Sequence, residues 1–279
     1  MKATNWLIIA YIIYFQSPIE INSQSIFNPI NSSRLYGIGG QTVAMDNAEA
    51  FPGNAASLAN IKYSTFSFNA ENRFAGSGII GSSIVAGLKL GSNEGLGLGA
   101  GYYGLPEYNQ LNFRIGYGMS LSKKIAIGTS GGIIQFNDPK REKSAFGMIQ
   151  LGIQYEILQN IQAGFSYHTI LRGNSTQGKL AMNVLLFGIK YSISSLVHFC
   201  SEVEKSIHSK ANIKAGIEYQ MIKTICFRTG ITTYPQSFST GIGLELNSRL
   251  LLDTAFSFYQ SIGLSPSIGV KLNLYKPTE

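Results

Sequence analysis

The sequence predicts an all-β protein: a transmembrane antiparallel β-barrel of about 14 strands, with an N-terminal plug or hatch segment in its lumen. Only 13% of the 279 residues are charged, whereas a soluble domain carries about a quarter. The mean hydropathy is nonetheless close to zero, which is unlike a helical membrane protein. Strands with an apolar face toward lipid and a polar face toward a lumen produce this combination.

The N-terminus is expected to be a secretory signal peptide. Lys2 supplies the positive charge, and the apolar run Trp6 to Phe15 has the length of a signal's hydrophobic core. That run is too short for a transmembrane helix, which needs about 20 residues. Cleavage after Ser23 leaves Gln24 as the first residue. The expected divisions of the chain are a signal peptide at 1–23, a plug segment at 24–61 and a barrel at 62–279.

Residues 24–61 do not alternate and are not expected to form a strand pair. Glycine and other small residues dominate, and the short stretch from Thr42 to Ala50 has helical potential. A wide barrel encloses water unless chain or side chains fill it. We therefore expect this segment to fold into the lumen as a plug.

From Lys62 onward, apolar and polar residues alternate with period two, which is typical of strands with one apolar face. Between Ser237 and Asn247, for example, Phe238 and Ile242 share one face while serines and glycines form the other. The segments are longer than the 5–6 residues typical of soluble strands and suit the roughly 9–11 of a membrane strand. The expected strands lie near 62–73, 79–90, 94–104, 108–121, 123–136, 144–157, 160–171, 181–193, 195–204, 209–221, 223–234, 237–247, 249–260 and 262–275.

Alternate glycines from Gly95 to Gly101 superficially match a phosphate-binding loop. Such a loop needs a glycine turn that opens a helix, and no strand–helix unit is predicted here. We interpret the repeat as a wall face without bulk, which leaves space for a plug or an open lumen.

No catalytic, metal-binding or cofactor-binding constellation stands out, so we expect no enzyme, no metal and no cofactor. Cys200 and Cys226 fall on strands two apart, a separation of about 10 Å at roughly 4.8 Å per strand, which exceeds disulfide reach. The three histidines match no metal motif. The net charge of +7 is spread along the chain rather than clustered as nucleic-acid binding requires.

Strand parity places a set of charged residues on the lumen side. We expect them mainly to pair with one another and with the plug, since buried charges cost least when they are paired. Their alternative role is selectivity along a transport pathway. The set comprises Arg114, Lys190, Lys214, Glu218, Arg228, Glu245, Asp253 and Lys271.

The plug segment carries a motif of glycines, small residues and a few polar ones: Arg34, Gly37, Gly39, Gly40, Val43, Ala44 and Asp46, then Asn54, Ala56 and Leu58. This motif resembles the N-terminal motif of the FadL-like outer-membrane proteins. That superfamily includes long-chain fatty-acid transporters and the PorV/PorQ group, which is associated with type IX secretion in Bacteroidetes. Family members usually carry Asn-Pro-Ala where this chain has Asn54-Ala55-Ala56.

The resemblance implies a barrel with a hatch in its lumen, located in the outer membrane of a Gram-negative bacterium, with Bacteroidetes as the expected source. From the residues themselves, we expect the glycines to permit tight turns. Arg34 is expected to pair with a wall carboxylate such as Glu245 or Asp253, because a buried charge needs a partner.

Three functions remain open. The favoured hypothesis is a PorV-like accessory barrel that partners other outer-membrane or secreted proteins, in keeping with short loops and the absent proline. The alternative is a FadL-type transporter of a hydrophobic small molecule, and the third is a purely structural or adhesion barrel without a ligand. The lumen faces considered above are small and polar, which argues against the mostly apolar lining of a hydrophobic site.

Overall fold

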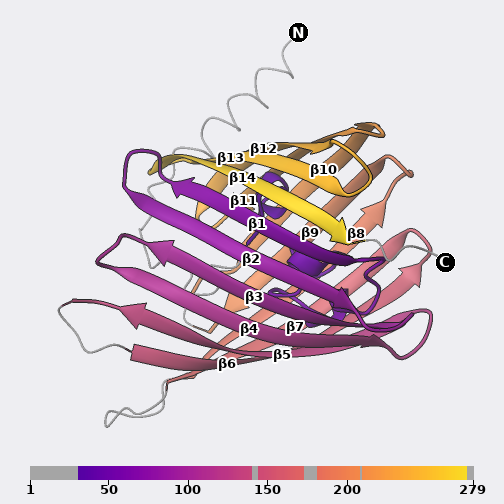
Figure 1. Cartoon of the computed structure of the whole chain (residues 1–279), viewed down its shortest axis with the longest axis horizontal. Helices are drawn as coiled ribbons and strands as arrows, with labels where there is room; N and C mark the ends of the chain where they lie inside the picture. Colours follow the sequence, from indigo (N-terminus) through magenta and orange to yellow (C-terminus); the bar gives the residue numbers. More distant parts are fainter. Residues whose placement is uncertain (1–30, 140–143, 173–180, 208, 275–279) are drawn as a thin grey trace, which may run out of the picture.

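The computed structural model describes residues 31–139, 144–172, 181–207 and 209–274. The expected signal peptide therefore lies outside the described residues. The strands form one closed barrel in which every strand pairs antiparallel with its sequence neighbours and β1 closes against β14 (Figure 1). This confirms the predicted antiparallel β-barrel of fourteen strands.

The fourteen strands lie within a few residues of their predicted positions. They are β1 (Ser64–Arg73), β2 (Ile79–Lys89), β3 (Glu94–Gly104), β4 (Asn109–Ser120), β5 (Ile125–Asn137), β6 (Ser144–Leu158), β7 (Ile161–Arg172), β8 (Ala181–Ser192), β9 (Val197–Ser206), β10 (Asn212–Ile222), β11 (Ile225–Thr233), β12 (Gln236–Glu245), β13 (Leu250–Tyr259) and β14 (Gly263–Leu274).

The outer wall of the barrel is apolar because side chains alternate along each strand. On β4, Phe113 and Ile115 are 55% and 54% exposed, while the adjacent Asn112 and Arg114 are 0% and 4% exposed. The same alternation recurs around the ring, so large apolar side chains cover the outside. Water would not stabilise such a surface, whereas lipid does. The strands are therefore membrane-spanning.

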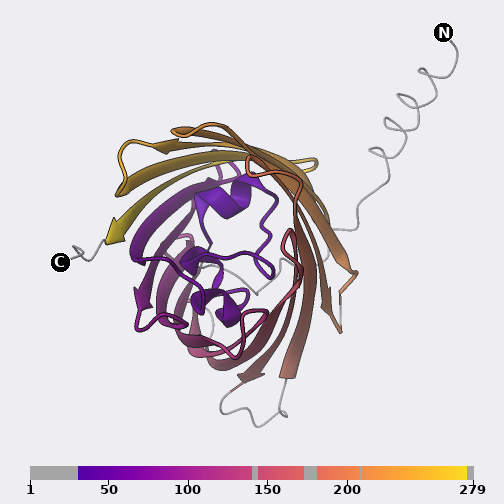
Figure 2. The same cartoon turned by 90° about the vertical axis from the view of Figure 1, so that its right-hand side faces the viewer.

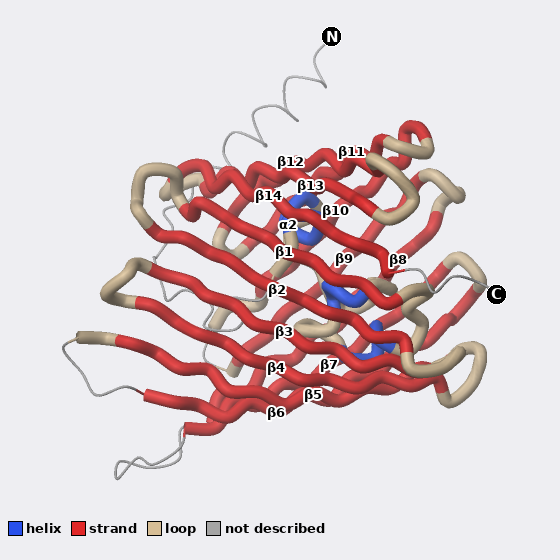
Figure 3. Tube along the Cα trace, in the orientation of Figure 1, coloured by secondary structure: helices blue, strands red, loops and turns tan. Residues whose placement is uncertain are grey.

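The described part of the N-terminal region, residues 31–61, lies inside the ring of strands (Figures 2 and 3). We call it the lumen segment. It contains the helix α2 (Ser33–Gly37) and the 3-10 helices η1 (Ala48–Ala50) and η2 (Ala55–Leu58). Helix α2 contacts β11 to β14 and β1, η1 contacts β2, and η2 contacts β3 to β6. The segment thus reaches walls on different sides of the lumen.

Of the stretch with helical potential from Thr42 to Ala50, only the last turn is helical, as the 3-10 helix η1. The backbone amides of Thr42 and Val43 donate to the Glu202 carboxylate on β9, at 2.6 and 2.8 Å. The Asn47 side chain then caps the short η1 by accepting from the amide of Ala50. Contacts with the barrel thus override local helical potential here, as tertiary context commonly does.

Cys200 on β9 and Cys226 on β11 are both free and buried, with β10 between their strands, as the predicted strand separation requires. Among the described residues, no helix is long and apolar enough to span a membrane.

Candidate functional site

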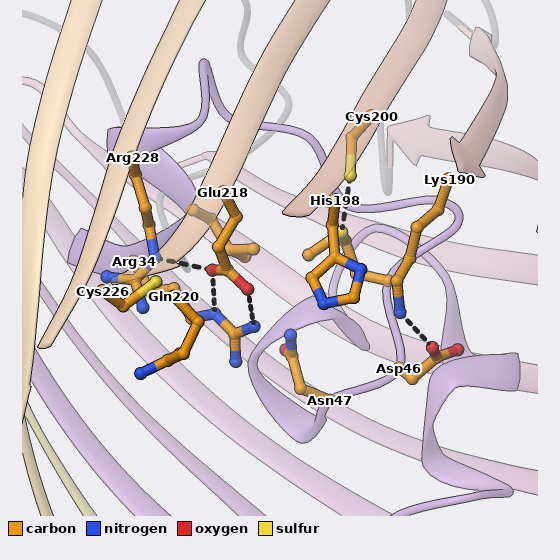
Figure 4. A network of polar contacts seen from close by, with 12 residues as sticks. Arg34, Asp46, Asn47, Lys190, His198, Cys200, Glu218, Gln220, Cys226 and Arg228 are labelled. Atoms are coloured by element: carbon orange, nitrogen blue, oxygen red, sulfur yellow. Dashed lines mark hydrogen bonds and ion pairs between the residues drawn. The ribbon is translucent and has the colours of Figure 1, made fainter. Parts of the chain in front are cut away.

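A chain of ion pairs joins α2 to the barrel wall (Figure 4). Arg34 donates to both carboxylate oxygens of Glu218, at 3.1 and 2.9 Å. Arg228 donates to Glu218 at 2.6 Å and to Asp253 at 2.5 Å. The attraction of Glu218 raises the pKa of the Arg34 guanidinium above its ordinary value, so Arg34 stays charged. A bidentate arginine–carboxylate pair fixes geometry as well as charge, and it orients α2 against β10 and β11.

Glu202 on β9 holds the next stretch of the lumen segment. One of its oxygens accepts from the amides of Thr42 and Val43, and the other accepts from Lys214 at 2.8 Å. Lys214 also donates to the carbonyl of Gly40 at 3.3 Å. Because Glu202 is 2% exposed, its charge is stabilised almost wholly by these donors.

Two lysines of the wall pair with acidic residues of the lumen segment. Lys190 on β8 contacts Asp46 at 2.5 Å, and Lys271 on β14 contacts Glu49 at 3.5 Å. The Lys190–Asp46 pair is partly exposed, so solvent screens it and it contributes little stability. Lys271 and Glu49 are buried, and their mutual proximity limits the cost of burying both charges.

Several hydrogen bonds hold the turn between η1 and η2 against the barrel wall. Arg114 on β4 donates to the carbonyl of Pro52. The side chain of Asn54 caps η2 by accepting from the amide of Ala56, and it donates to the carbonyls of Val43 and Ile153 at 2.8 and 3.2 Å. Asn54 therefore joins two parts of the lumen segment to β6.

Inward-facing glycines allow the lumen segment to pack directly on the strands. A Cβ at Gly128 would lie 2.3 Å from the carbonyl carbon of Ala55, and one at Gly230 would lie 2.3 Å from that of Ile38. A Cβ at Gly95, within the alternating glycine run, would lie 2.4 Å from the carbonyl oxygen of Leu58. Real Cβ atoms do not approach backbone this closely, so these wall positions require glycine.

One region of the inner wall is apolar, and the sequence analysis missed it. It lies on β5 to β8, at the end of the barrel where β5 and β7 finish, and Val43 and Ala44 of the lumen segment pack against it. We call this wall region the apolar sector. Its members are the buried Ile134, Met148, Ile170, Val184 and Leu186 with the partly buried Phe136, Phe146 and Met182.

The apolar sector corrects the expectation of a uniformly small and polar lumen. That expectation came from strand faces such as the serines and glycines of 237–247, and from charged residues of the wall, most of which lie on β8 to β14. In β5 and β8, apolar pairs such as Ile133-Ile134 and Leu185-Leu186 put a large residue on both faces: Ile133 is 57% exposed and Ile134 0%. Such pairs interrupt the apparent alternation, and strand parity then assigns one member to the lumen.

The structure places several other residues of the predicted motif and of the predicted charged set. Gly37 and Leu58 are buried, while Gly39 and Gly40 have positive φ of 82° and 73° and form the turn after α2. Glu245 is exposed at the end of β12. Arg34 pairs with a wall carboxylate, as expected, but its partner is Glu218 on β10 and not Glu245 or Asp253.

Glu202 and Glu71 are polar residues of the lumen that the sequence analysis did not single out. Glu202 is two residues from Cys200 and therefore lies on the same, inner face of its strand. Glu71 is an odd number of residues from the outward-facing Phe66 and Phe68 and therefore points inward. The alternation of side chains along the strand would therefore have placed both glutamates in the lumen. No group of three or more His, Cys, Asp or Glu side chains in the described part of the chain is arranged to hold a metal ion.

Comparison with solved structures gives matches over most of this chain. The toluene transporter TbuX of Ralstonia pickettii aligns with a TM-score of 0.66 at 12% identity, covering 90% of this chain and all of the other. The toluene transporter TodX of P. putida gives 0.64 at 10% identity over 89% and 100%. A FadL homologue of Pseudomonas aeruginosa gives 0.61 at 9% identity over 90% and 100%.

The sequence matches no protein-family model and no curated protein significantly. At identities this low, structural similarity establishes a shared fold and no more. The chain thus has the fold of FadL-type outer-membrane transporters.

Proposed function

We propose that this protein is an outer-membrane barrel that moves a hydrophobic small molecule across the outer membrane, as a FadL-type transporter. The observation that carries the proposal is the apolar sector inside the lumen. Ligand sites for such molecules are concave and mostly apolar, with a few placed polar groups. The isoleucine, leucine and methionine side chains of this sector face the lumen, where Val43 and Ala44 of the lumen segment now cover them.

The energetic reason is the transfer of apolar surface from water. Burial against an apolar wall is worth about 25 cal/mol per Å². A hydrophobic solute that takes the place of Val43 and Ala44 against Ile170, Leu186 and Met148 would gain this free energy, while a polar solute would not. The apolar sector would therefore concentrate hydrophobic molecules near the lumen segment, where Val43 and Ala44 lie.

The fold supports the same function. The neighbours with toluene in their names are transporters of that hydrocarbon, and they align along almost their whole length. An outer-membrane location agrees with the lipid-facing wall and with the expected signal peptide. Transport is better supported than the accessory-barrel hypothesis that the sequence favoured. Short loops and a small barrel do not distinguish a partner barrel from a transporter of this fold.

Uptake by whole cells tests the proposal. The protein is produced in a Gram-negative host that lacks its own channels for hydrophobic solutes, and uptake of radiolabelled toluene and hexadecanoate is measured. We expect faster uptake of at least one of them than in cells without the protein. The Leu186→Gln variant should slow that uptake about fivefold or more, because a buried amide on the wall is left without partners.

Leu186→Met is the matched control, since it keeps an apolar side chain of similar volume. It should transport like the unaltered protein. Assembly of each variant is checked by its heat-modifiable migration in gels. Uptake no faster than in cells without the protein, or the same in the glutamine and methionine variants, would rule the proposal out.

A further inference from the structure

A small polar pocket lies between the lumen segment and strands β1, β2 and β3. Its principal lining residues are Asn31, Tyr36, Asn69, Glu71, Ser83 and Tyr103. It is partly open to solvent, and its interior has room for about one water-sized group. The pocket is separate from the apolar sector, because no residue of β5 to β8 lines it.

Two buried side chains bring unused hydrogen-bonding groups to this pocket. Asn69 and Glu71 are each 5% exposed and lie two residues apart on the inner face of β1. The Asn69 oxygen accepts from the amide of Ser33 at 3.0 Å, and one Glu71 oxygen accepts from Arg73 at 2.9 Å. Within the described residues, the Asn69 amide nitrogen and the second Glu71 oxygen have no partner.

Asn69 and Glu71 give the pocket no net charge, because Asn69 is neutral and Glu71 is paired with Arg73. The salt bridge to Arg73 neutralises Glu71, and the Arg73 guanidinium is itself held over the rings of Phe74 and Tyr259, at 4.8 and 4.4 Å. Burial raises the pKa of Tyr36, and so do the charge of the nearby Glu71 and, as the smallest cause, a side-chain hydrogen bond to Glu71. The Tyr36 phenol therefore stays neutral, and it lies beside the carboxylate whose second oxygen has no partner within hydrogen-bond distance. A full charge on a ligand would thus enter without a counter-charge and lose its hydration.

The unused groups define the ligand's chemistry. The Glu71 oxygen only accepts, so the ligand must donate; the Asn69 NH₂ only donates, so the ligand must also accept. A hydroxyl does both from a single small atom. A carboxylate would face the Glu71 oxygen, and an ether would leave that oxygen unsatisfied.

We propose that this pocket binds the hydroxyl group of a neutral alcohol, with Glu71 as acceptor and Asn69 as donor. The body of the alcohol remains at the pocket mouth beside Tyr36 and Tyr103, whose rings offer apolar contact. This site goes beyond the proposed transport function and does not depend on it.

A ligand series that shares one ring tests the proposal on the unmodified protein in detergent. Benzyl alcohol, benzyl methyl ether, toluene, benzoate and benzylammonium are titrated by calorimetry against protein and against empty micelles. We expect saturable binding of benzyl alcohol and at least tenfold weaker binding of the other four. Equal affinities across the series, a preference for benzoate or benzylammonium, or no saturable binding of the alcohol would overturn the assignment.

Glu71→Gln then tests the acceptor itself. The glutamine oxygen faces Arg73 and its NH₂ faces the pocket, so the pocket offers only donors. Affinity for benzyl alcohol should fall at least tenfold, while that for benzyl methyl ether should rise. Glu107→Gln, which alters an exposed carboxylate between β3 and β4, should change neither. An unchanged alcohol affinity in Glu71→Gln would refute the role of Glu71, and the ligand series stands even where this variant fails to fold.

Discussion

Glu218 joins two arginines that come from distant parts of the chain. It accepts from Arg34 on α2 and from Arg228 on β11, and its side chain is only 11% exposed. Two guanidinium groups held near each other repel, and a carboxylate between them offsets this repulsion by attracting both. Glu218 is therefore the residue on which the position of α2 depends electrostatically.

Replacing Glu218 by Gln should destabilise the folded protein. The substitution removes the carboxylate that the partly exposed Arg34 and the buried Arg228 share, and leaves Arg228 with Asp253 alone. Removal of one partner from a buried pair typically costs about 3–5 kcal/mol, and the partial exposure of Arg34 places the cost toward the lower end. Reversible unfolding by denaturant in lipid vesicles measures the change in free energy.

Arg34→Gln and the double variant complete the comparison. Since the two residues are in contact, their effects should not add, and the double variant should be less destabilised than the sum. The exposed Glu107→Gln is the control and should change the free energy of unfolding little. Additive effects of Glu218→Gln and Arg34→Gln would show that the contact does not hold α2.

The lumen segment has little regular structure of its own, since α2 has five residues and the two 3-10 helices have three and four. Its order comes from the wall, where glycines let strands and segment backbones touch. The segment and the glycine pattern of the strands therefore form one packing unit, because a bulky residue on either side removes the contact.

Gly128→Ala should loosen η2 without preventing barrel assembly. Its Cβ would lie 2.3 and 2.4 Å from backbone atoms of Ala55 and Ala56, so the segment must shift. Hydrogen–deuterium exchange of the peptide covering residues 48–58 should become faster. Gly147→Ala is the matched control, because a Cβ there meets nothing within 4 Å. Identical exchange in the two variants would contradict this account of the packing.

The whole molecule combines a closed wall with chain inside it. All strand edges are paired, so the barrel does not need the lumen segment to satisfy its backbone hydrogen bonds. The segment instead covers polar and charged groups of the inner wall, including Glu202, Lys214 and Lys271. These groups would hold water if the segment were absent.

Deletion of residues 24–60 should therefore leave a barrel that still inserts into membranes but conducts ions. Conductance in planar bilayers is expected to rise clearly above that of the full mature chain, because water replaces the lumen segment. The gel migration of the folded barrel serves as the control for insertion. If conductance stays at the level of the full chain, the segment does not occlude the lumen.

The sequence by itself determined the barrel and the positions of its strands. Side chains on a strand alternate strictly between the two faces, so a wall between lipid and lumen leaves a local pattern that can be read residue by residue. The same parity placed charges such as Lys214 and Asp253 on the inner side, and it explained the glycine run from Gly95 to Gly101 as a wall without bulk. These features depend on neighbours along the chain.

Only the tertiary structure decided which groups meet inside. Arg34 and Glu218 are 184 positions apart, and Val43 and Glu202 are 159 apart, so no local pattern relates them. The apolar sector likewise draws on four strands, and although apolar pairs in β5 and β8 mark single inward residues, no local pattern shows that these residues meet. The contents of the lumen follow from ring closure and from the path of the lumen segment across it. Both are properties of the whole chain in three dimensions.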